Sequence, residues 1–159
     1  MPAIALNHVS VGARDLEASC RFYEELFGME RIPTPNFGGR VQWLRLGGQQ
    51  LHLARRDLEP NPYQHFAITV DDFPAVYARA KELGIFESRM QGYHLSELPD
   101  GKVQLYLRDP SGNVLEVNNP DVTTLPDEIR AEMTRLVDAY PQSEENLRAT
   151  LYATPDDAP

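Results

Sequence analysis

The sequence is poor in cysteine and in long apolar stretches. Cys20 is the only cysteine, so no disulfide forms within the chain, and the composition suits a reducing cytoplasm. On an apolar helix face, Cys20 is expected to be a small buried packing residue. The first residues lack a basic region followed by an apolar run, and no later stretch has the length that a bilayer crossing requires. We therefore expect a cytoplasmic protein that is neither exported nor inserted in a membrane.

Positive charge is also scarce. The chain has 15 Lys and Arg against 24 Asp and Glu, a net charge of −9. Because a nucleic-acid binder normally carries a basic face, the expected partner is a small molecule rather than a polyanion. The 159 residues are enough for one domain with a core of its own and no covalent staples.

Histidine is rare, but its placement is informative. The four histidines lie in short apolar stretches that are predicted to be strands, and Glu116 lies in a fifth. A single histidine is often a partly buried residue whose ring binds a backbone carbonyl. Imidazoles and a carboxylate from separate strands, however, are the usual ligands of a divalent metal site. The histidines are His8, His52, His65 and His94.

An internal repeat relates some of these residues. Residues 7–11 align with residues 64–68, and the offset of 57 places His65 on His8. In addition, His52 and Glu116 occupy equivalent places in the last strands of the two halves. Independent packing histidines have no reason to follow a repeat, whereas ligands of one central ion do, so the set favours metal binding.

Each half of the repeat has the pattern of a strand, a helix and two or three strands. Asp15 and Asp72 are expected to cap the two helices at their N-termini, and Gly28 and Gly84 to end them. Between cap and glycine, apolar residues recur at helical spacing. The predicted later strands are residues 39–46, 50–54, 86–95, 103–108 and 113–118.

The domain organisation follows from this pattern. Modules at about 4–56 and 63–118 form one domain, 1–120, and 121–159 form a helical extension packed on it, with a loose tail. In the extension, residues 143–152 are predicted to form a second helix that buries Leu147 and Leu151. The first helix is predicted from the apolar residues Ile129, Met133, Leu136, Val137 and Tyr140.

Strand alternation predicts where the candidate ligands point. Successive side chains face opposite sides of a sheet, and the apolar neighbours of each candidate lie on the other face. We therefore expect His8, His52, His65 and Glu116 to converge on the face that the helices do not cover. The same alternation places further candidates for the substrate pocket on that face, although ordinary residues at the rim of a sheet would look the same: Trp43, Arg45, Gln104 and Arg108.

The paired units, the strand-borne His8 and His65, and the segment LYLRDPSGNVLE at residues 105–116 resemble the vicinal oxygen chelate superfamily. This superfamily includes glyoxalase I, fosfomycin and bleomycin resistance proteins and extradiol ring-cleaving dioxygenases. The resemblance covers about residues 4–118. It implies an α+β fold in which paired βαβββ modules form a cupped, barrel-like mixed sheet, and a metal that chelates two neighbouring substrate oxygens.

Among the branches, the extradiol dioxygenases match the most residues. Their motif runs Gly-x-His, an apolar residue and Tyr, Asp-Pro-x-Gly and Glu, which His94, Tyr106, residues 109–112 and Glu116 follow, with a longer gap after the histidine. The resemblance implies cleavage of a catechol-type aromatic with O2. It also implies Fe(II) on His8, His65 and Glu116, an acid/base role for His52, and hydrogen bonds from His94 and Tyr106 to the substrate oxygens.

Three alternatives stay open. Glyoxalase-like relatives place a fourth metal ligand at the position of His52, which would imply Ni, Zn, Co or Mn and proton transfer next to a carbonyl. A non-catalytic resistance protein would bind its small molecule in the cup, but such relatives generally lack the metal residues. A fosfomycin-modifying enzyme is expected to have cationic residues soon after Glu116, where this chain has Asn118-Asn119-Pro120.

The oligomeric state is expected by analogy. Many two-module relatives form dimers, so we expect a homodimer.

Overall fold

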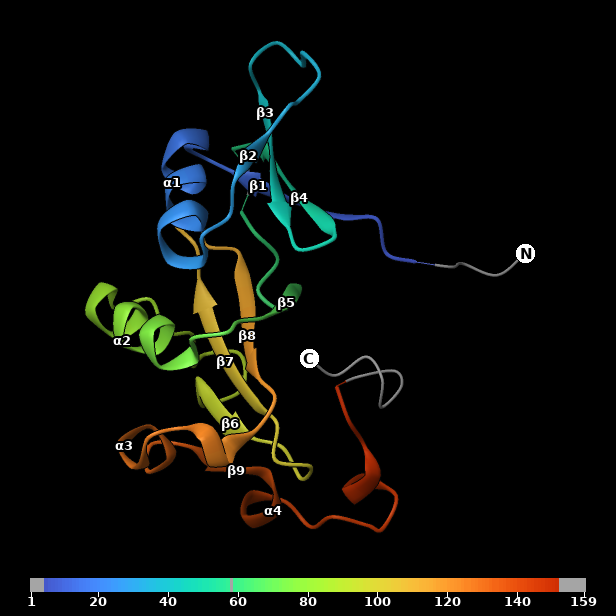
Figure 1. Cartoon of the computed structure of the whole chain (residues 1–159), viewed down its shortest axis with the longest axis vertical. Helices are drawn as coiled ribbons and strands as arrows, with labels where there is room; N and C mark the ends of the chain where they lie inside the picture. Colours follow the sequence, from blue (N-terminus) through green and yellow to red (C-terminus); the bar gives the residue numbers. More distant parts are fainter. Residues whose placement is uncertain (1–4, 58, 152–159) are drawn as a thin grey trace. The chain divides into compact units, whose positions relative to one another are not determined.

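The computed structural model describes residues 5–57 and 59–151. These residues belong to two compact units. One contains the chain up to Phe66 together with Arg108–Asn113, and the other contains Ala67–Leu107 and the chain from Val114 onward. The expected α+β fold is confirmed, because the described residues form two mixed sheets with few helices (Figure 1).

The first sheet has the strand order β1-β4-β3-β2. β1 and β4 are parallel, and the other neighbours are antiparallel. The hairpin between β3 and β4 turns at Gly47-Gly48, as predicted, with Leu46 opposite Gln49. The elements of this module are β1 (His8–Ala13), α1 (Leu16–Phe27), β2 (Arg31–Ile32), β3 (Val41–Leu46) and β4 (Gln49–Arg55).

The second sheet has the order β5-β8-β7-β6-β9. Its first four strands repeat the order of the first sheet with every strand number raised by four, which confirms the internal repeat. The elements are β5 (His65–Thr69), α2 (Phe73–Leu83), β6 (Leu95–Glu97), β7 (Val103–Arg108), β8 (Val114–Asn119) and β9 (Thr134–Arg135).

Both long helices begin and end where the sequence predicts. The carboxylate of Asp15 accepts from the Ala18 amide at 2.9 Å, and the matching cap is Asp72. Gly28 ends α1 with φ 62°, in the left-handed region that favours glycine. α2 ends in the same way at its own glycine. Local signals of this kind place the two helices within the repeat.

The apolar faces of the strands form the core of each unit, and alternation is confirmed. In β4, for example, Leu51 and Leu53 are buried while His52 between them is half-buried. Cys20 is buried, as expected, and burial raises the pKa of its thiol. The largest fully buried side chains of the second unit are Phe73, Leu95, Leu105, Leu107, Leu115, Glu87, Val103 and Val114.

The predicted strand at residues 86–95 is wrong for most of its length. Phe86 makes one isolated bridge to Leu107, and the strand proper is β6, which begins at Leu95. The residues between them form turns. His94 therefore lies just before a strand rather than within one.

The C-terminal extension does not contain the predicted long helix. Its helical pieces are short, and β9 interrupts them by pairing in parallel with β6, with Arg135 opposite Glu97. The guanidinium of Arg135 also donates to the Glu97 carboxylate at 3.0 Å. By pairing with the edge of the sheet, Thr134 and Arg135 bond backbone N–H and C=O groups that would otherwise be bonded within a helix. The pieces are η1 (Val122–Thr124), α3 (Asp127–Arg130), α4 (Leu136–Ala139) and η2 (Asn146–Arg148).

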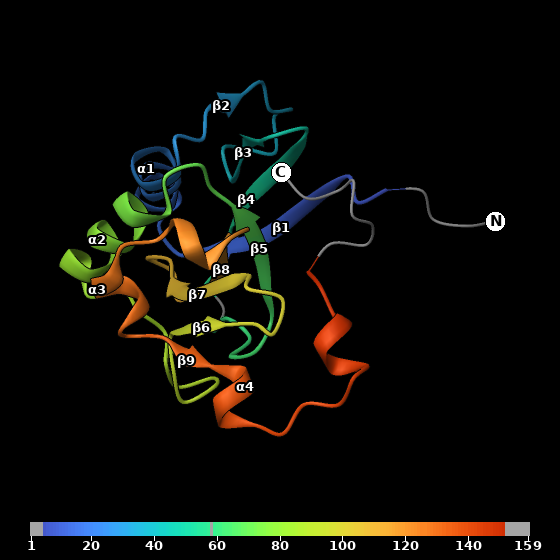
Figure 2. The same ribbon diagram turned by 60° about the horizontal axis from the view of Figure 1, so that its bottom comes forward.

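The prediction of a second, buried helix at 143–152 is also wrong. Only η2 forms within this segment as far as residue 151, and Leu147 and Leu151 are 48% and 39% exposed. The predicted loose tail, residues 155–159, lies outside the described residues. Figure 2 shows α2 and α3 on the same side of the second sheet. Within the described ranges, no helix has the length and apolarity that a membrane crossing needs.

Candidate metal centre

The predicted ligands are divided between the two units. His8, His52 and His65 belong to the first unit, and Glu116 belongs to the second. Among residues 5–57 and 59–151, no three His, Cys, Asp or Glu side chains are close enough together to share a metal ion. The ligand set thus stays a prediction that draws on both units, and each unit is described here by its own contacts.

In the first unit, two of the predicted residues lie side by side. The rings of His8 and His52 stack with centroids 4.2 Å apart, and Trp43 stacks on the other side of His52 at 4.4 Å. The pairing of the strands explains the Trp43 contact, because Trp43 of β3 is directly opposite His52. On the other side of His52, the opposite residue of β1 is Ser10, and His8 lies two residues before it on the same face of the strand. Burial and the neighbouring His8 lower the pKa of His52.

The hydrogen bonds of the three histidines favour particular tautomers. Nδ1 of His8 is 2.9 Å from Oδ1 of Asn7, and Nδ1 of His65 is 3.1 Å from the carbonyl of Tyr63. Both partner atoms can only accept, so Nδ1 carries the hydrogen and Nε2 carries the lone pair. His52 has the opposite arrangement, because its Nε2 is 2.8 Å from Oε1 of Gln50. His8 and His65 are therefore prepared in the way that metal-binding imidazoles usually are.

In the second unit, Glu116 is buried and held by neighbouring side chains. Its Oε1 accepts from Nε2 of Gln104 at 2.9 Å and from Nδ2 of Asn118 at 2.7 Å. Gln104 lies on β7, and Asn118 lies two residues along β8 on the same face as Glu116. Two amide donors on one oxygen stabilise the carboxylate and restrict its rotation.

Tyr106 is the predicted catalytic residue that lies beside Glu116. Its hydroxyl is hydrogen-bonded to Glu116 and to Gln91. Burial raises the pKa of Tyr106, and the charge of Glu116 raises it further. Its phenol is consequently a neutral hydrogen-bond donor within this network.

His94 lies in a different environment. Its ring stacks on Phe86 at 4.2 Å, and Phe86 in turn contacts Tyr77 of α2 at 5.1 Å between centroids. The Nε2 atom is buried and has no hydrogen-bond partner among the described residues, and burial lowers the pKa of the ring. The charged groups that act on it are Glu132 and Lys81, rather than Glu116. These surroundings favour a packing role for the ring of His94, although its backbone carbonyl accepts from the Tyr106 amide at 2.7 Å.

Of the four predicted pocket residues, two contact other predicted site residues and two make contacts elsewhere. Trp43 belongs to the ring stack and Gln104 holds Glu116, so both lie against predicted site residues. Arg45 is exposed and pairs with Glu30 at 3.4 Å. The guanidinium of Arg108 donates to the carbonyl of Gly112 at 2.6 Å, which is a contact within a turn.

That turn, residues 109–113, belongs to the first unit. Asp109 accepts from the hydroxyl of Tyr23 at 3.0 Å and from two backbone amides of its own turn at 2.9 Å. The Ser111 hydroxyl accepts from the backbone amide of Arg14, and the side-chain amide of Asn113 donates to the Gly12 carbonyl. The Asp-Pro-Ser-Gly part of the motif therefore has a structural role, which makes it weak evidence for a particular reaction.

Sequence reasoning missed two residues of the Glu116 network. Asn118 had a usable signal, because alternation along β8 puts it on the face of Glu116. Gln91 had none, because it lies in a turn whose path depends on the surrounding fold.

The chain belongs to the Glyoxalase/Bleomycin resistance protein/Dioxygenase superfamily, whose family model matches residues 5–117. It is 29% identical to Metallothiol transferase FosB of Lysinibacillus sphaericus over 73% of this chain and 82% of that protein. It is also 29% identical to Glyoxylase I 4 of Arabidopsis thaliana, over 88% and 89% of the two chains. Among solved structures, Oxidase ChaP-H2 is similar at a TM-score of 0.59 and 28% identity, covering 74% of this chain and 94% of that one.

Because the chain belongs to this superfamily, we expect it to be an enzyme. Relatives in this superfamily include a glyoxylase, a metallothiol transferase and an oxidase, and enzymes of the superfamily use divalent metals. The fold is thus shared by several reactions, and the reaction of this chain must be argued from its own site.

Proposed function

We propose that this protein is a metal-dependent dioxygenase that cleaves the ring of a catechol-type aromatic with O2. The proposal depends most on the hydrogen bonding of the three histidines. His8 and His65 both keep the lone pair on Nε2, whereas His52 engages its Nε2 with Gln50. This difference favours two equivalent histidine ligands and a third histidine with another task.

The donor set fits a divalent metal, with Fe(II) favoured. His8, His65 and Glu116 would hold the ion as two imidazoles and one carboxylate, the set typical of non-haem iron enzymes that use O2. When bound, such an ion supplies adjacent positions for the two substrate oxygens and for O2. The orienting hydrogen bonds on each predicted ligand match the second layer of contacts that metal ligands usually have.

The chain's own residues would prepare the ligands and manage protons. Gln104 and Asn118 fix the Glu116 carboxylate through one of its oxygens. Tyr106, beside that carboxylate, would donate a hydrogen bond to a substrate oxygen. His52, whose Nε2 is engaged with Gln50, would accept and return a proton at Nδ1. We leave His94 out of this machinery because its ring packs among Phe86 and the residues around it.

Other members of the superfamily give mixed support. Oxidase ChaP-H2, an enzyme with a named oxidative activity, is 28% identical to this chain, which supports oxygen chemistry on this fold. FosB is similar too, but the residues after Glu116 are amides used in internal contacts. Asn118 binds Glu116, and Asn119 donates to the Asp121 carbonyl. The cations expected of a fosfomycin enzyme are not at these positions.

A glyoxalase-like activity is the second candidate. It is favoured by the stacking of His52 on His8 at 4.2 Å, which keeps a fourth donor beside a predicted ligand. In that case all of His8, His52, His65 and Glu116 would bind the metal, and the reaction would be proton transfer next to a carbonyl.

The test is anaerobic loading with Fe(II), addition of substituted catechols, and measurement of O2 uptake together with the yellow ring-opened product. Uptake that requires both iron and catechol supports the proposal, and no uptake across a broad catechol panel overturns it. The metal site has a separate test in the double variant His8→Ala with Glu116→Ala. If this variant binds divalent metal as tightly as the parent, the residues are not ligands.

A further inference from the structure

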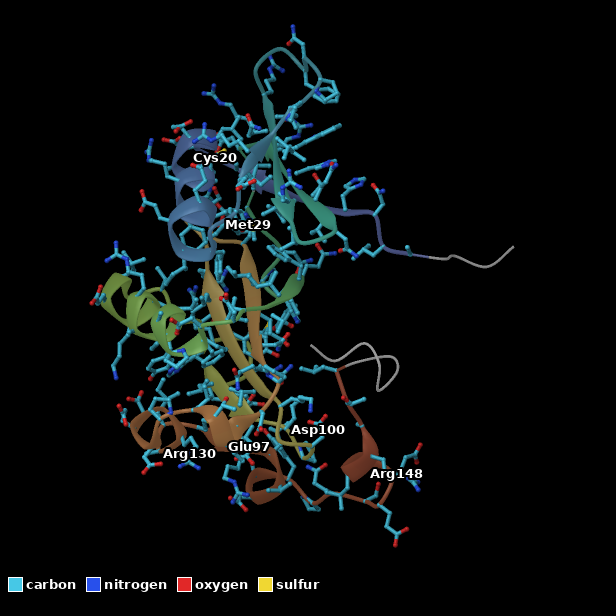
Figure 3. The ribbon with its side chains drawn as sticks, in the orientation of Figure 1. Cys20, Met29, Glu97, Asp100, Arg130 and Arg148 are labelled. Atoms are coloured by element: carbon cyan, nitrogen blue, oxygen red, sulfur yellow. The ribbon has the colours of Figure 1, made fainter. Side chains whose placement is uncertain are left out.

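The second unit contains a cavity of about 340 Å³. Its walls come from the hairpin between β6 and β7 and from the C-terminal extension. In Figure 3, Asp100 marks the hairpin and Arg148 marks η2 of the extension. Six of the lining residues matter here: Leu98, Pro99, Gln104, Leu136, Ala149 and Leu151.

Within the described residues, the exposed lining is mostly apolar, and its polar side chains carry no charge: they are Gln104, Gln142, Asn146 and Thr150. None of the described side chains that line this cavity ionises, so an ionic group would enter it without a partner from among them and at a high desolvation cost. Two amide side chains at the wall are already used internally. Nε2 of Gln142 donates to the carbonyls of Leu136 and Tyr140, and Oδ1 of Asn146 accepts from the Ser143 amide.

One wall residue connects the cavity to the candidate metal centre. Gln104 lines the cavity and donates to Glu116 at 2.9 Å. A group that fills the cavity therefore lies against the residue that holds a predicted metal ligand. Sequence analysis gave the extension no functional role, yet its residues Leu136, Ala149 and Leu151 complete this wall.

We propose that this cavity binds an uncharged apolar substituent, alkyl or aryl, of the molecule on which the enzyme acts. The volume is at the lower end of the range for small-molecule sites, and larger than a cavity that accepts a single benzene ring. The inference rests on the proposed function, because it takes the reacting oxygens to lie on the Glu116 side of Gln104. The C-terminal extension would then select substrates by size and polarity, while the residues of the two modules carry the chemistry.

The experiment measures binding without turnover. The full-length, metal-free protein is titrated with phenol and with 4-butylphenol, and the dissociation constants are measured by NMR chemical-shift changes. Burial of the butyl group predicts that 4-butylphenol binds tighter than phenol by at least about tenfold. The shift changes should include the backbone amides of Gln104 and Ala149.

Two variants on the same segment make the test specific. Ala149→Phe places a ring in the cavity and is expected to remove the preference for 4-butylphenol. Leu147→Phe is the matched control, because Leu147 is 48% exposed and does not line the cavity, so the preference should persist. Thermal unfolding curves of both variants serve to check that they are folded.

Three results would overturn the inference. They are equal binding of the two phenols, an unchanged preference in Ala149→Phe, and binding that appears only after residues 152–159 are removed, which would make the chain's own end the occupant. Each is distinct from failure of the proposed dioxygenase function, because no metal, O2 or turnover enters the measurement. A preference for 4-butylphenol in a protein that shows no O2 uptake would keep the cavity and reject the reaction.

Discussion

The rings of His8 and His52 lie stacked 4.2 Å apart on neighbouring parallel strands, yet their hydrogen bonds expose different nitrogens. His8 engages Nδ1 with Asn7, and His52 engages Nε2 with Gln50. Adjacent positions of the same residue type can therefore have different roles. The reaction class of the protein depends on which role His52 has.

His52→Gln separates these roles. If His52 moves a proton next to the metal, the variant retains its bound metal and loses turnover by about 10²-fold or more. If His52 is a fourth ligand, the metal affinity itself falls. The measurement is metal content after dialysis, set beside O2 uptake with catechols. We expect retained metal and lost uptake, and loss of both together would favour the glyoxalase-like site.

Gln104 is expected to position Glu116 rather than bind metal itself. Removing its amide in Gln104→Ala leaves Glu116 with its Asn118 and Tyr106 contacts and restricts the carboxylate less. Loss of such an orienting contact typically weakens metal binding by about 10- to 100-fold. Calorimetric titration of the metal-free protein with Fe(II) or Mn(II) measures this change. The matched control is Gln49→Ala on the exposed start of β4, and an equal loss in both variants would argue against a positioning role.

His94 gives a prediction that separates packing from catalysis. His94→Phe keeps a flat ring against Phe86 and removes the buried Nε2 that has no hydrogen-bond partner within the described residues. We expect the melting temperature to stay the same or rise, because an unsatisfied buried polar atom costs about 1–3 kcal/mol. His94→Ala, which loses the stacked ring, should lower it. O2 uptake that disappears in His94→Phe while the protein remains folded would restore the catalytic role implied by the sequence resemblance.

The features that the sequence predicted well are those with local causes. Helix α1 follows from apolar spacing between an aspartate cap and a glycine, and the side of the sheet that carries His52 follows from alternation along one strand. β9 could not be predicted in this way. Its two residues are extended because they pair with β6, and their own sequence continues a helical apolar pattern. Pairing with a distant strand prevailed over local periodicity.

The site residues show the same limit. Alternation placed Gln104 and Glu116 on one face, where they form a hydrogen-bonded network with Tyr106, which was assigned by its place in a motif. His94 was assigned by its place in a motif, and a motif gives order along the chain without direction in space. Its ring packs on Phe86, a contact whose geometry depends on the turn between them.

Asp109 predicts a pH dependence of stability in the first unit. Burial raises the pKa of Asp109, although its hydrogen bonds with Asn113 and Tyr23 oppose the change. The folded protein thus keeps this proton to higher pH than the unfolded chain does. The stabilising contribution of Asp109 is fully present below the unfolded pKa of about 3.9 and is lost as the pH rises through the folded value.

The measurement compares melting temperatures of the parent and of Asp109→Asn from about pH 4 to pH 7. The variant loses one acceptor oxygen and should be less stable throughout, but the parent's advantage should shrink as the pH rises. Asp121→Asn is a control of opposite sign, because hydrogen bonds from Thr123 lower the pKa of Asp121. Its contribution is present above about pH 3.9 and is lost as the pH falls through the folded value. A parent advantage over Asp109→Asn that grows with pH would mean that hydrogen bonding at the turn outweighs burial.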